Sequence, residues 1–244
     1  MDLDALLSKL PGVKISVIGD LCLDAYWDVD MQRSEASVET GLPTRSVRGQ
    51  RYSLGGAGNV ARNLTALGVT AVSVYGVAGS DPFGYQMREF MRALGICTDG
   101  MLEQSEDWVT HTYIKPIEQG NEANRIDFGN FNRLADETAR WLVASLGDDL
   151  DELDLIVINQ QVTGGIHRSA LLQDQLQSLI QAHHDKPFLL DSRDISQGYE
   201  GTMRKINGYE AVTLMGAQVE PRDVIGLDDI RRAGLKLAAQ WGKT

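Results

Sequence analysis

A glycine-rich segment at residues 53–68, SLGGAGNVARNLTALG, opens a predicted helix and carries few side chains at its turn. Glycine lets the main chain approach a ligand closely, so this turn either holds a ligand or makes a tight connection between a strand and a helix. It lacks the Lys-Ser/Thr pair of a P-loop and the glycine spacing of a dinucleotide fingerprint. The segment is therefore not predicted to bind a nucleotide.

Two aspartates follow the segment KISVIG at residues 14–19, which is short, β-branched and apolar and so predicts a buried strand. Asp20 and Asp24 would then lie at the carboxyl end of that strand, where open α/β sheets bind their ligands. For Asp20, a capping or solvated carboxylate is an equal alternative to a role in binding.

Strand and helix patterns alternate along most of the chain and predict a doubly wound, mainly parallel α/β sheet with helices on both faces. Two polar, extended segments at 29–52 and 109–128 interrupt this alternation, and we expect them to form one small β-sheet beside the core. The expected core comprises the three remaining ranges, 1–28, 53–108 and 129–244.

The composition is typical of a soluble globular protein with a small-molecule partner. With 34 acidic and 23 basic residues, the formal net charge of −11 argues against a non-specific nucleic-acid binder. No apolar stretch reaches membrane-spanning length, and the first residues lack the features of a secretory signal, so a cytoplasmic location is expected. Cys22 and Cys97 are far apart and outside any metal-ligand spacing, and we expect both to be buried free thiols.

Five motifs taken together resemble the ribokinase or PfkB family of carbohydrate kinases: GDLCLD, LGGAGNVARNLTALG, GVAGSDPFG, LLDSR and NGYEAV. Within that family the chain is most similar to kinases acting on heptose 7-phosphate, and the resemblance runs from about Lys14 to the end. It implies a doubly wound α/β domain with a small β-sheet lid over the sugar, ATP as co-substrate and Mg²⁺ as cofactor. By analogy it also implies a homodimer formed through the lid.

The resemblance assigns the sugar end of the site to residues in the first half of the chain. Asp24 would accept hydrogen bonds from sugar hydroxyls, while Gly55, Gly56 and Asn59 would hold the sugar. Glycine allows the ring to approach the backbone, and the Asn59 amide offers a donor and an acceptor to one diol. Arg125 would meet a sugar phosphate as a bidentate donor, with an ordinary surface arginine as an equal alternative.

The resemblance assigns the nucleotide end to residues further along the chain. Asn207 and Glu210 match the family's Asn-x-x-Glu, whose carboxylate orders water around Mg²⁺ near the nucleotide phosphates. Helix capping followed by a solvated glutamate is the alternative. Asp191 and Arg193, at the end of LLDSR, are expected to lie near the nucleotide and Mg²⁺, and no direct metal ligand is expected.

The chain departs from the heptose kinases in two places. Residues 160–164 read QQVTG where those kinases have Asp-Tyr-x-Lys-Gly, so a lysine that would touch phosphate is absent. The family's Gly-Ala-Gly-Asp motif supplies an anion hole and the catalytic base; it does not occur in residues 1–244, and we expect the base beyond Thr244.

The expected function is therefore that of an ATP-dependent sugar or sugar-phosphate kinase, of which this chain is the N-terminal two-thirds and inactive by itself. A non-catalytic sugar-binding protein with a truncated kinase fold is one alternative. A nucleoside kinase of the same family is the other.

Overall fold

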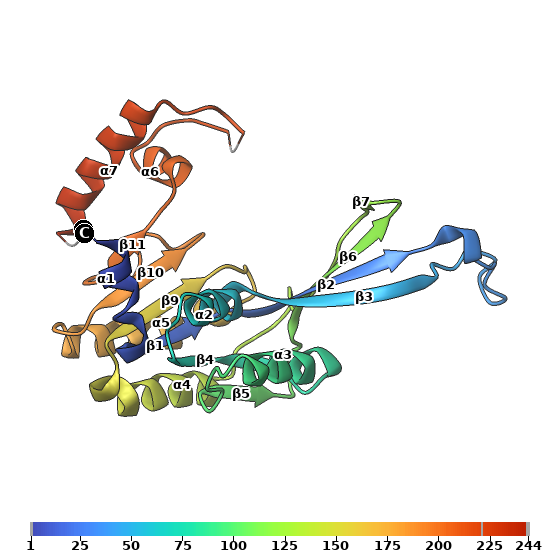
Figure 1. Ribbon diagram of the computed structural model, residues 1–244, viewed down its shortest axis with the longest axis horizontal. Helices are drawn as coiled ribbons and strands as arrows, with labels where there is room; N and C mark the ends of the chain where they lie inside the picture. The colour runs from blue at the N-terminus through green and yellow to red at the C-terminus, as the bar shows by residue number, and fades with distance from the viewer. Residues whose placement is uncertain (1, 221, 243–244) are drawn as a thin grey trace.

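Two β-sheets organise the computed structural model, which describes residues 2–220 and 222–242 (Figure 1). The larger sheet has the strand order β11-β10-β9-β1-β4-β5, and every neighbouring pair in it is parallel. Its strands are β1 (Lys14–Gly19), β4 (Ala71–Gly79), β5 (Met101–Gln104), β9 (Leu155–Gln160), β10 (Phe188–Ser192) and β11 (Met203–Lys205).

Helices cover both faces of this sheet because successive buried strand residues point to opposite sides. Val17 belongs to the apolar cluster formed with α2 and α3, and the next residue, Ile18, belongs to the cluster formed with α4 and α5. The doubly wound α/β fold expected from the sequence is thus confirmed. The four helices are α2 (Gly56–Ala66), α3 (Pro82–Ala93), α4 (Asp136–Asp149) and α5 (Ala170–Ala182).

The strand order reverses beside β1, which has β4 on one side and β9 on the other. At such a switch point the connections leave in opposite directions and open a crevice at the carboxyl ends of the strands. The chain leaves β1 at this point to enter the second sheet. The segments that follow β1 and β9 are therefore the ones expected to line such a crevice.

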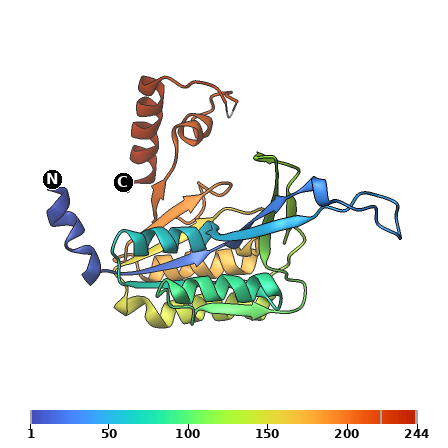
Figure 2. The same cartoon turned by 45° about the vertical axis from the view of Figure 1, so that its right-hand side comes forward.

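The second sheet is mixed and extends away from the central sheet (Figures 1 and 2). Its order is β3-β2-β6-β7, with β8 paired to β6; β2 runs antiparallel to β3 and parallel to β6. Its strands are β2 (Leu21–Val29), β3 (Val47–Gly55), β6 (His111–Glu118), β7 (Asn121–Glu122) and β8 (Ile126–Phe128).

The second sheet begins earlier in the chain than the boundary expected at residue 29. Strand β2 begins at Leu21, so residues 21–28 lie in the second sheet, and β3 continues to Gly55 rather than ending before residue 53. The apolar start of β2 continues the pattern of β1, and Leu21 and Leu23 are buried in the core, which is why composition alone does not reveal the change of sheet.

The last two helices, α6 (Gly208–Leu214) and α7 (Leu227–Trp241), pack on each other around a small apolar cluster and stand at the top of both views (Figures 1 and 2). A short helix, α1 (Leu3–Leu7), precedes β1. None of the helices in the described ranges is long and apolar enough to span a bilayer. Single 3-10 turns complete the structure at Leu10–Gly12, Met31–Arg33, Leu150–Glu152 and Ile166–Arg168.

The two cysteines are both free, but only Cys22 is buried as expected. Cys97 is exposed, because it lies in the short connection between α3 and β5 at the edge of the central sheet.

Candidate active site

The glycine-rich turn joins the end of β3 to the start of α2 and is held against the end of β1. Gly56 has a φ of +52°, and a Cβ there would lie 2.2 Å from the carbonyl oxygen of Asp20. The Ala57 N–H donates to that same carbonyl at 2.9 Å. Both the backbone conformation and the close approach require glycine, so the turn is fixed in place at the crevice.

Asn59 lies in the first turns of α2 with an exposed side chain. Its amide has no hydrogen-bond partner among residues 2–220 and 222–242, which leaves the donor and the acceptor free for a ligand. A Cβ on Gly55 would lie 3.3 Å from Oδ2 of Asp24, so the Asp24 carboxylate rests against the same turn. The structure thus brings together Asp24, Gly55 and Gly56, as the sequence predicted.

Asp24 is held by a lysine from the neighbouring strand. Lys115 on β6 approaches Oδ1 of Asp24 at 2.8 Å, and only 18% and 22% of the two side chains is exposed. The Lys115 ammonium also lies 4.9 Å from the ring centre of Tyr26. Burial lowers the pKa of Lys115, but the hydrogen bond and charge of Asp24 outweigh it and leave that pKa above its ordinary value. A pair this enclosed is screened less than a surface pair, so the carboxylate has a defined position.

Asp20 is 1% exposed, and both of its carboxylate oxygens are occupied by main-chain donors. Oδ2 accepts from the N–H groups of Gln161 and Val162 at 2.8 and 3.1 Å, and Oδ1 accepts from that of Ile166 at 3.0 Å. Burial raises the pKa of Asp20, and these donors partly offset the rise. The Asp20 carboxylate is therefore not exposed to solvent or to a ligand. Its hydrogen bonds instead hold the turn that follows β9.

Arg125 lies on the second sheet with its guanidinium already engaged. It donates to both carboxylate oxygens of Asp127 at 2.6 and 2.7 Å and stacks on Tyr113, 4.4 Å from the ring centre. Tyr113 is the register partner of Asp24, so Arg125 and Asp24 share one face of the sheet. A phosphate on this face would have to compete with Asp127 for the arginine.

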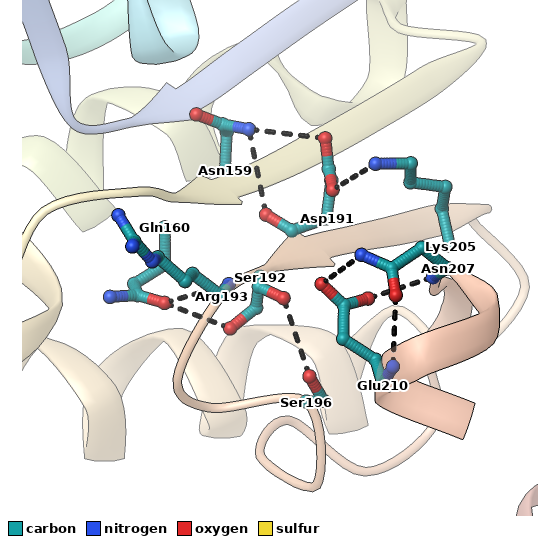
Figure 3. Close-up of polar contacts among 9 residues, drawn as sticks. All are labelled: Asn159, Gln160, Asp191, Ser192, Arg193, Ser196, Lys205, Asn207 and Glu210. Atoms are coloured by element: carbon teal, nitrogen blue, oxygen red, sulfur yellow. Dashed lines mark hydrogen bonds and ion pairs between the residues drawn. The ribbon is translucent and has the colours of Figure 1, made fainter. Parts of the chain in front are cut away.

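Asp191, at the end of β10, belongs to a small polar cluster (Figure 3). Lys205 donates to Oδ1 of Asp191 at 3.0 Å, and the amide of Asn159 donates to Oδ2 at 3.4 Å. Arg193 begins the next loop; its main-chain N–H donates to the carbonyl of Gln160 at 3.0 Å, and its exposed guanidinium has no partner in the described chain. These contacts place Asp191 and Arg193 on the same edge of the sheet.

Asn207 and Glu210 form a reciprocal capping box at the start of α6 (Figure 3). The Glu210 N–H donates to the side chain of Asn207 at 2.8 Å, and the Glu210 carboxylate accepts from the N–H of Asn207 at 2.8 Å. Glu210 also lines a cavity of about 560 Å³ together with Arg193 and Tyr209. The capping role is thus present in the structure, and the half-buried Glu210 also lines a cavity that a ligand can enter.

The residues around this cavity fit a nucleotide with Mg²⁺ held through water. Within the described ranges, no group of three or more His, Cys, Asp and Glu side chains is arranged to hold a metal directly. Mg²⁺ keeps several waters, so a carboxylate such as Glu210 would hold it through them. The unpartnered guanidinium of Arg193 offers the planar fork that phosphate prefers.

Sequence reasoning missed three side chains that organise the site: Lys115, Lys205 and Gln160. The alternation in HTYIKPIE places Lys115 on the same face as Tyr113, and this signal could have identified it. Gln160 lies where the chain departs from the heptose kinases and makes five hydrogen bonds through its side chain. No pattern in the sequence marks Lys205.

A six-stranded parallel sheet, helices on both of its faces, and a second mixed sheet beside a crevice at the strand ends define the ribokinase-like class of α/β proteins. The sequence matches the pfkB family of carbohydrate kinases over residues 14–229. The chain belongs to this family.

Individual relatives agree with this assignment. The chain is 32% identical over 226 residues to the bifunctional protein HldE of Caulobacter sp. (strain K31), a match that covers 88% of this chain and 43% of that protein. It is 28% identical over 196 residues to the D-beta-D-heptose 7-phosphate kinase of Bordetella bronchiseptica, covering 79% of this chain and 58% of that protein. The chain thus spans about half the length of these relatives.

Among solved structures, the chain resembles the Arabidopsis thaliana ribokinase complexed with ribose and ATP. The TM-score is 0.62 at 16% identity, over 93% of this chain and 69% of that chain. At this identity the likeness shows the fold.

Proposed function

We propose that this chain carries the substrate-binding part of an ATP-dependent kinase that transfers the γ-phosphoryl group to a hydroxyl of a sugar or sugar phosphate. The observation that carries the proposal is that the Asp24 carboxylate lies against Gly55 at the glycine-rich turn, beside the switch point of the central sheet. Membership of the pfkB family supports it.

At the sugar end, Asp24 accepts hydrogen bonds from hydroxyl groups while Lys115 fixes the carboxylate. The absence of side chains at Gly55 and Gly56 lets the ring approach the backbone, and Asn59 donates to and accepts from a neighbouring diol. Positioning of this kind contributes a large share of phosphoryl-transfer catalysis, because little covalent chemistry is required of the protein.

At the nucleotide end, Arg193 binds phosphate oxygens, and Glu210, with Asn207, holds water around Mg²⁺. When bound, MgATP supplies the phosphoryl group and shields its charge. The cavity beside Glu210 and the Lys205–Asp191 pair at the ends of β10 and β11 support this placement. The Arabidopsis relative, whose structure contains ribose and ATP, supports the two-substrate arrangement by fold analogy.

A sugar phosphate is the first acceptor to test. The relatives include a D-beta-D-heptose 7-phosphate kinase, and Arg125 lies on the same face of the second sheet as Asp24. Thr163 stands where the heptose kinases carry a lysine, so the acceptor's phosphate would depend on Arg125 and Lys115 instead.

Residues 1–244 contain no Gly-Ala-Gly-Asp sequence. In the family that motif supplies the anion hole and the base, so we propose that these residues alone bind the acceptor without phosphorylating it. We also propose a cytoplasmic reaction, supported by two free cysteines, and a homodimer formed through the second sheet, supported by the free edge of β3.

The test is a phosphorylation assay of the whole protein as the cell makes it, with MgATP and a panel of heptose phosphates, fructose phosphates, ribose and nucleosides. ADP formation is followed by a coupled assay and the product by mass spectrometry. Asp24→Ala should lower kcat/KM for the acceptor by about 100-fold, because two charge-assisted hydrogen bonds are lost, and leave the KM for ATP nearly unchanged.

Asp28→Ala is the matched control, since Asp28 lies further along β2 and pairs with Arg48 on the surface. Acceptor binding without ADP formation would favour a non-catalytic sugar-binding protein, and phosphorylation of nucleosides alone would favour a nucleoside kinase. Absence of any acceptor binding would overturn the proposal.

A further inference from the structure

Gln160 lies at the carboxyl end of β9 (Figure 3), is 4% exposed, and forms hydrogen bonds through both ends of its carboxamide. Its Oε1 accepts from the Ser192 hydroxyl at 2.9 Å and from the N–H groups of Arg193 and Asp194 at 3.1 and 2.8 Å. Its Nε2 donates to the Asp194 carboxylate at 3.1 Å and to the carbonyl of Val162 at 3.5 Å.

These bonds fix the start of the loop at 193–196. The Arg193 N–H is shared between Oε1 and the main-chain carbonyl of Gln160, at 3.1 and 3.0 Å. Ser192 continues the support, because its hydroxyl accepts from the N–H of Ile195 at 2.7 Å and its carbonyl accepts from the Ser196 hydroxyl at 3.3 Å. The loop is therefore held by the Gln160 amide and the hydroxyls of Ser192 and Ser196.

Gln160 also adjoins the sugar end of the crevice. The next two residues, Gln161 and Val162, donate their N–H groups to the Asp20 carboxylate, whose own main-chain carbonyl accepts from Ala57 at the start of α2. The glycine-rich turn and the loop at 193–196 are thus both connected to residues 160–162, at the end of β9 and directly after it.

We propose that Gln160 is a positioning residue of the nucleotide end: it holds the backbone of Arg193 so that the guanidinium of that residue faces the nucleotide phosphates. The proposal rests on the proposed kinase function. Arg193 and Asp194 line the cavity that Glu210 also faces, and the Arg193 guanidinium has no partner elsewhere in the described ranges. Arg193 itself is bound through its main-chain N–H, which leaves its side chain available to a ligand.

The arrangement requires an amide at this position. The oxygen of Gln160 accepts from the loop while its nitrogen donates to Asp194, and a carboxylate cannot donate. Gln160→Glu preserves the shape of the side chain but places a second carboxylate against that of Asp194. Repulsion between the two would release the loop.

The experiment measures MgATP binding to the whole protein by calorimetry, for Gln160→Glu, Asp194→Asn and the double variant. We expect Gln160→Glu to raise the Kd for MgATP about tenfold at about pH 8, with acceptor binding within about twofold of the unsubstituted protein. The double variant should recover most of the loss, because the introduced asparagine donates to the introduced carboxylate. Lowering the pH to about 5.5 should also reduce the difference in MgATP Kd between Gln160→Glu and the unsubstituted protein, because a protonated carboxyl can donate a hydrogen bond.

Gln181→Glu, which adds the same charge at an exposed position of α5, is the control and should change neither Kd. Equal MgATP affinity with and without Gln160→Glu would overturn the role of Gln160 and leave the kinase proposal standing. A loss that neither the double variant nor low pH relieves would show a general structural defect and also overturn it. If the unsubstituted protein binds no MgATP, the proposed nucleotide end is wrong, and the proposed role of Gln160 is wrong with it.

Discussion

At the scale of single residues, three charged side chains of the candidate site, Asp24, Asp191 and Arg125, are each held in an ion pair. Asp24 forms an ion pair with Lys115, Asp191 with Lys205, and Arg125 with Asp127. The pair of Asp24 and Lys115 is the most enclosed of the three, with about a fifth of each side chain exposed. Holding a carboxylate in one place before the ligand arrives reduces the ordering cost of binding.

Lys115→Met tests this role, because methionine keeps an unbranched apolar stem and removes the charge. We expect acceptor affinity to fall about fivefold, as Asp24 loses the partner that fixes it, while MgATP affinity stays the same. Calorimetric titration with the acceptor and, separately, with MgATP measures the two affinities independently. Arg48→Met, which removes the partner of Asp28 on the same sheet, is the control; equal acceptor affinity in both variants would contradict a positioning role for Lys115.

We expect His167 to make the free energy of unfolding depend on pH. It is 3% exposed, its Nδ1 lies 2.8 Å from the Tyr199 hydroxyl, and burial lowers its pKa to about 4. In the unfolded chain the imidazole titrates near its ordinary value of about 6.5, so between the two values only the unfolded state binds the proton. The free energy of unfolding should therefore fall by up to roughly 3 kcal/mol as the pH drops through this window.

The measurement is urea unfolding at several pH values between about 6.5 and 4. His167→Gln should flatten the dependence by up to one proton, because glutamine can still bond to Tyr199 but does not titrate in this range. His184→Gln, at an exposed position, should leave the slope unchanged. An unaltered slope in His167→Gln would show that His167 is not the group responsible.

At the scale of elements, the start of α6 combines a structural and a proposed chemical role in one residue. Glu210 closes the capping box with Asn207 and faces the cavity beside Arg193. Glutamine at this position also closes a capping box, so Glu210→Gln removes the charge while keeping the cap. The two roles can therefore be separated.

We expect Glu210→Gln to change the free energy of unfolding by less than about 0.5 kcal/mol, and to raise the Mg²⁺ concentration needed for half-maximal phosphorylation at least about tenfold. Glu210→Ala should show the same kinetic defect together with a loss of about 1 kcal/mol of stability. The assays are urea unfolding and steady-state kinetics over a Mg²⁺ series. Normal Mg²⁺ dependence in Glu210→Gln would leave capping as the only role of the residue.

Most elements of this fold could be predicted from the sequence because their signals are local. The Asn207 and Glu210 capping box marks the start of α6, and Gly68 and Gly95, both with positive φ, end the helices before them. The short strand β5 and the early start of β2 were not recognised, since MLEQ is brief and the start of β2 continues the apolar pattern of β1.

The sequence predicted only those residues of the candidate site that belong to a recognisable motif. Asp24 and the glycine-rich turn belong to such motifs, and the structure brings them together. The side chains that hold the site in place belong to no such motif, because their partners are distant in sequence. Gln160 forms a hydrogen bond with Asp194, 34 positions away, and Asp20 forms one with Gln161, 141 positions away. Neither bond follows from composition or periodicity.

At the scale of the whole molecule, residues 1–244 contain more of the groups proposed to bind the sugar than of the groups proposed to bind the nucleotide. The proposed sugar end is formed by segments from β1, β2, β3 and α2, which lie close together; the Asp20 carbonyl accepts from the start of α2, and its carboxylate accepts from the turn after β9. The proposed nucleotide end has Arg193 and Glu210 at its edge, and the Gly-Ala-Gly-Asp sequence that we propose would complete it does not occur in these residues.

This difference predicts that residues 1–244 bind the acceptor but form no product. A ligand that binds only the folded state at about 100 times its Kd raises the free energy of unfolding by about 2.7 kcal/mol, so the preferred acceptor should raise the thermal midpoint of this chain by several degrees. Asp24→Ala should abolish the rise, and Asp28→Ala, whose partner is Arg48, should retain it. With MgATP added, no ADP should form above background; ADP formation that depends on the acceptor, in a preparation verified by mass, would show that this chain supplies an anion hole and a base of its own.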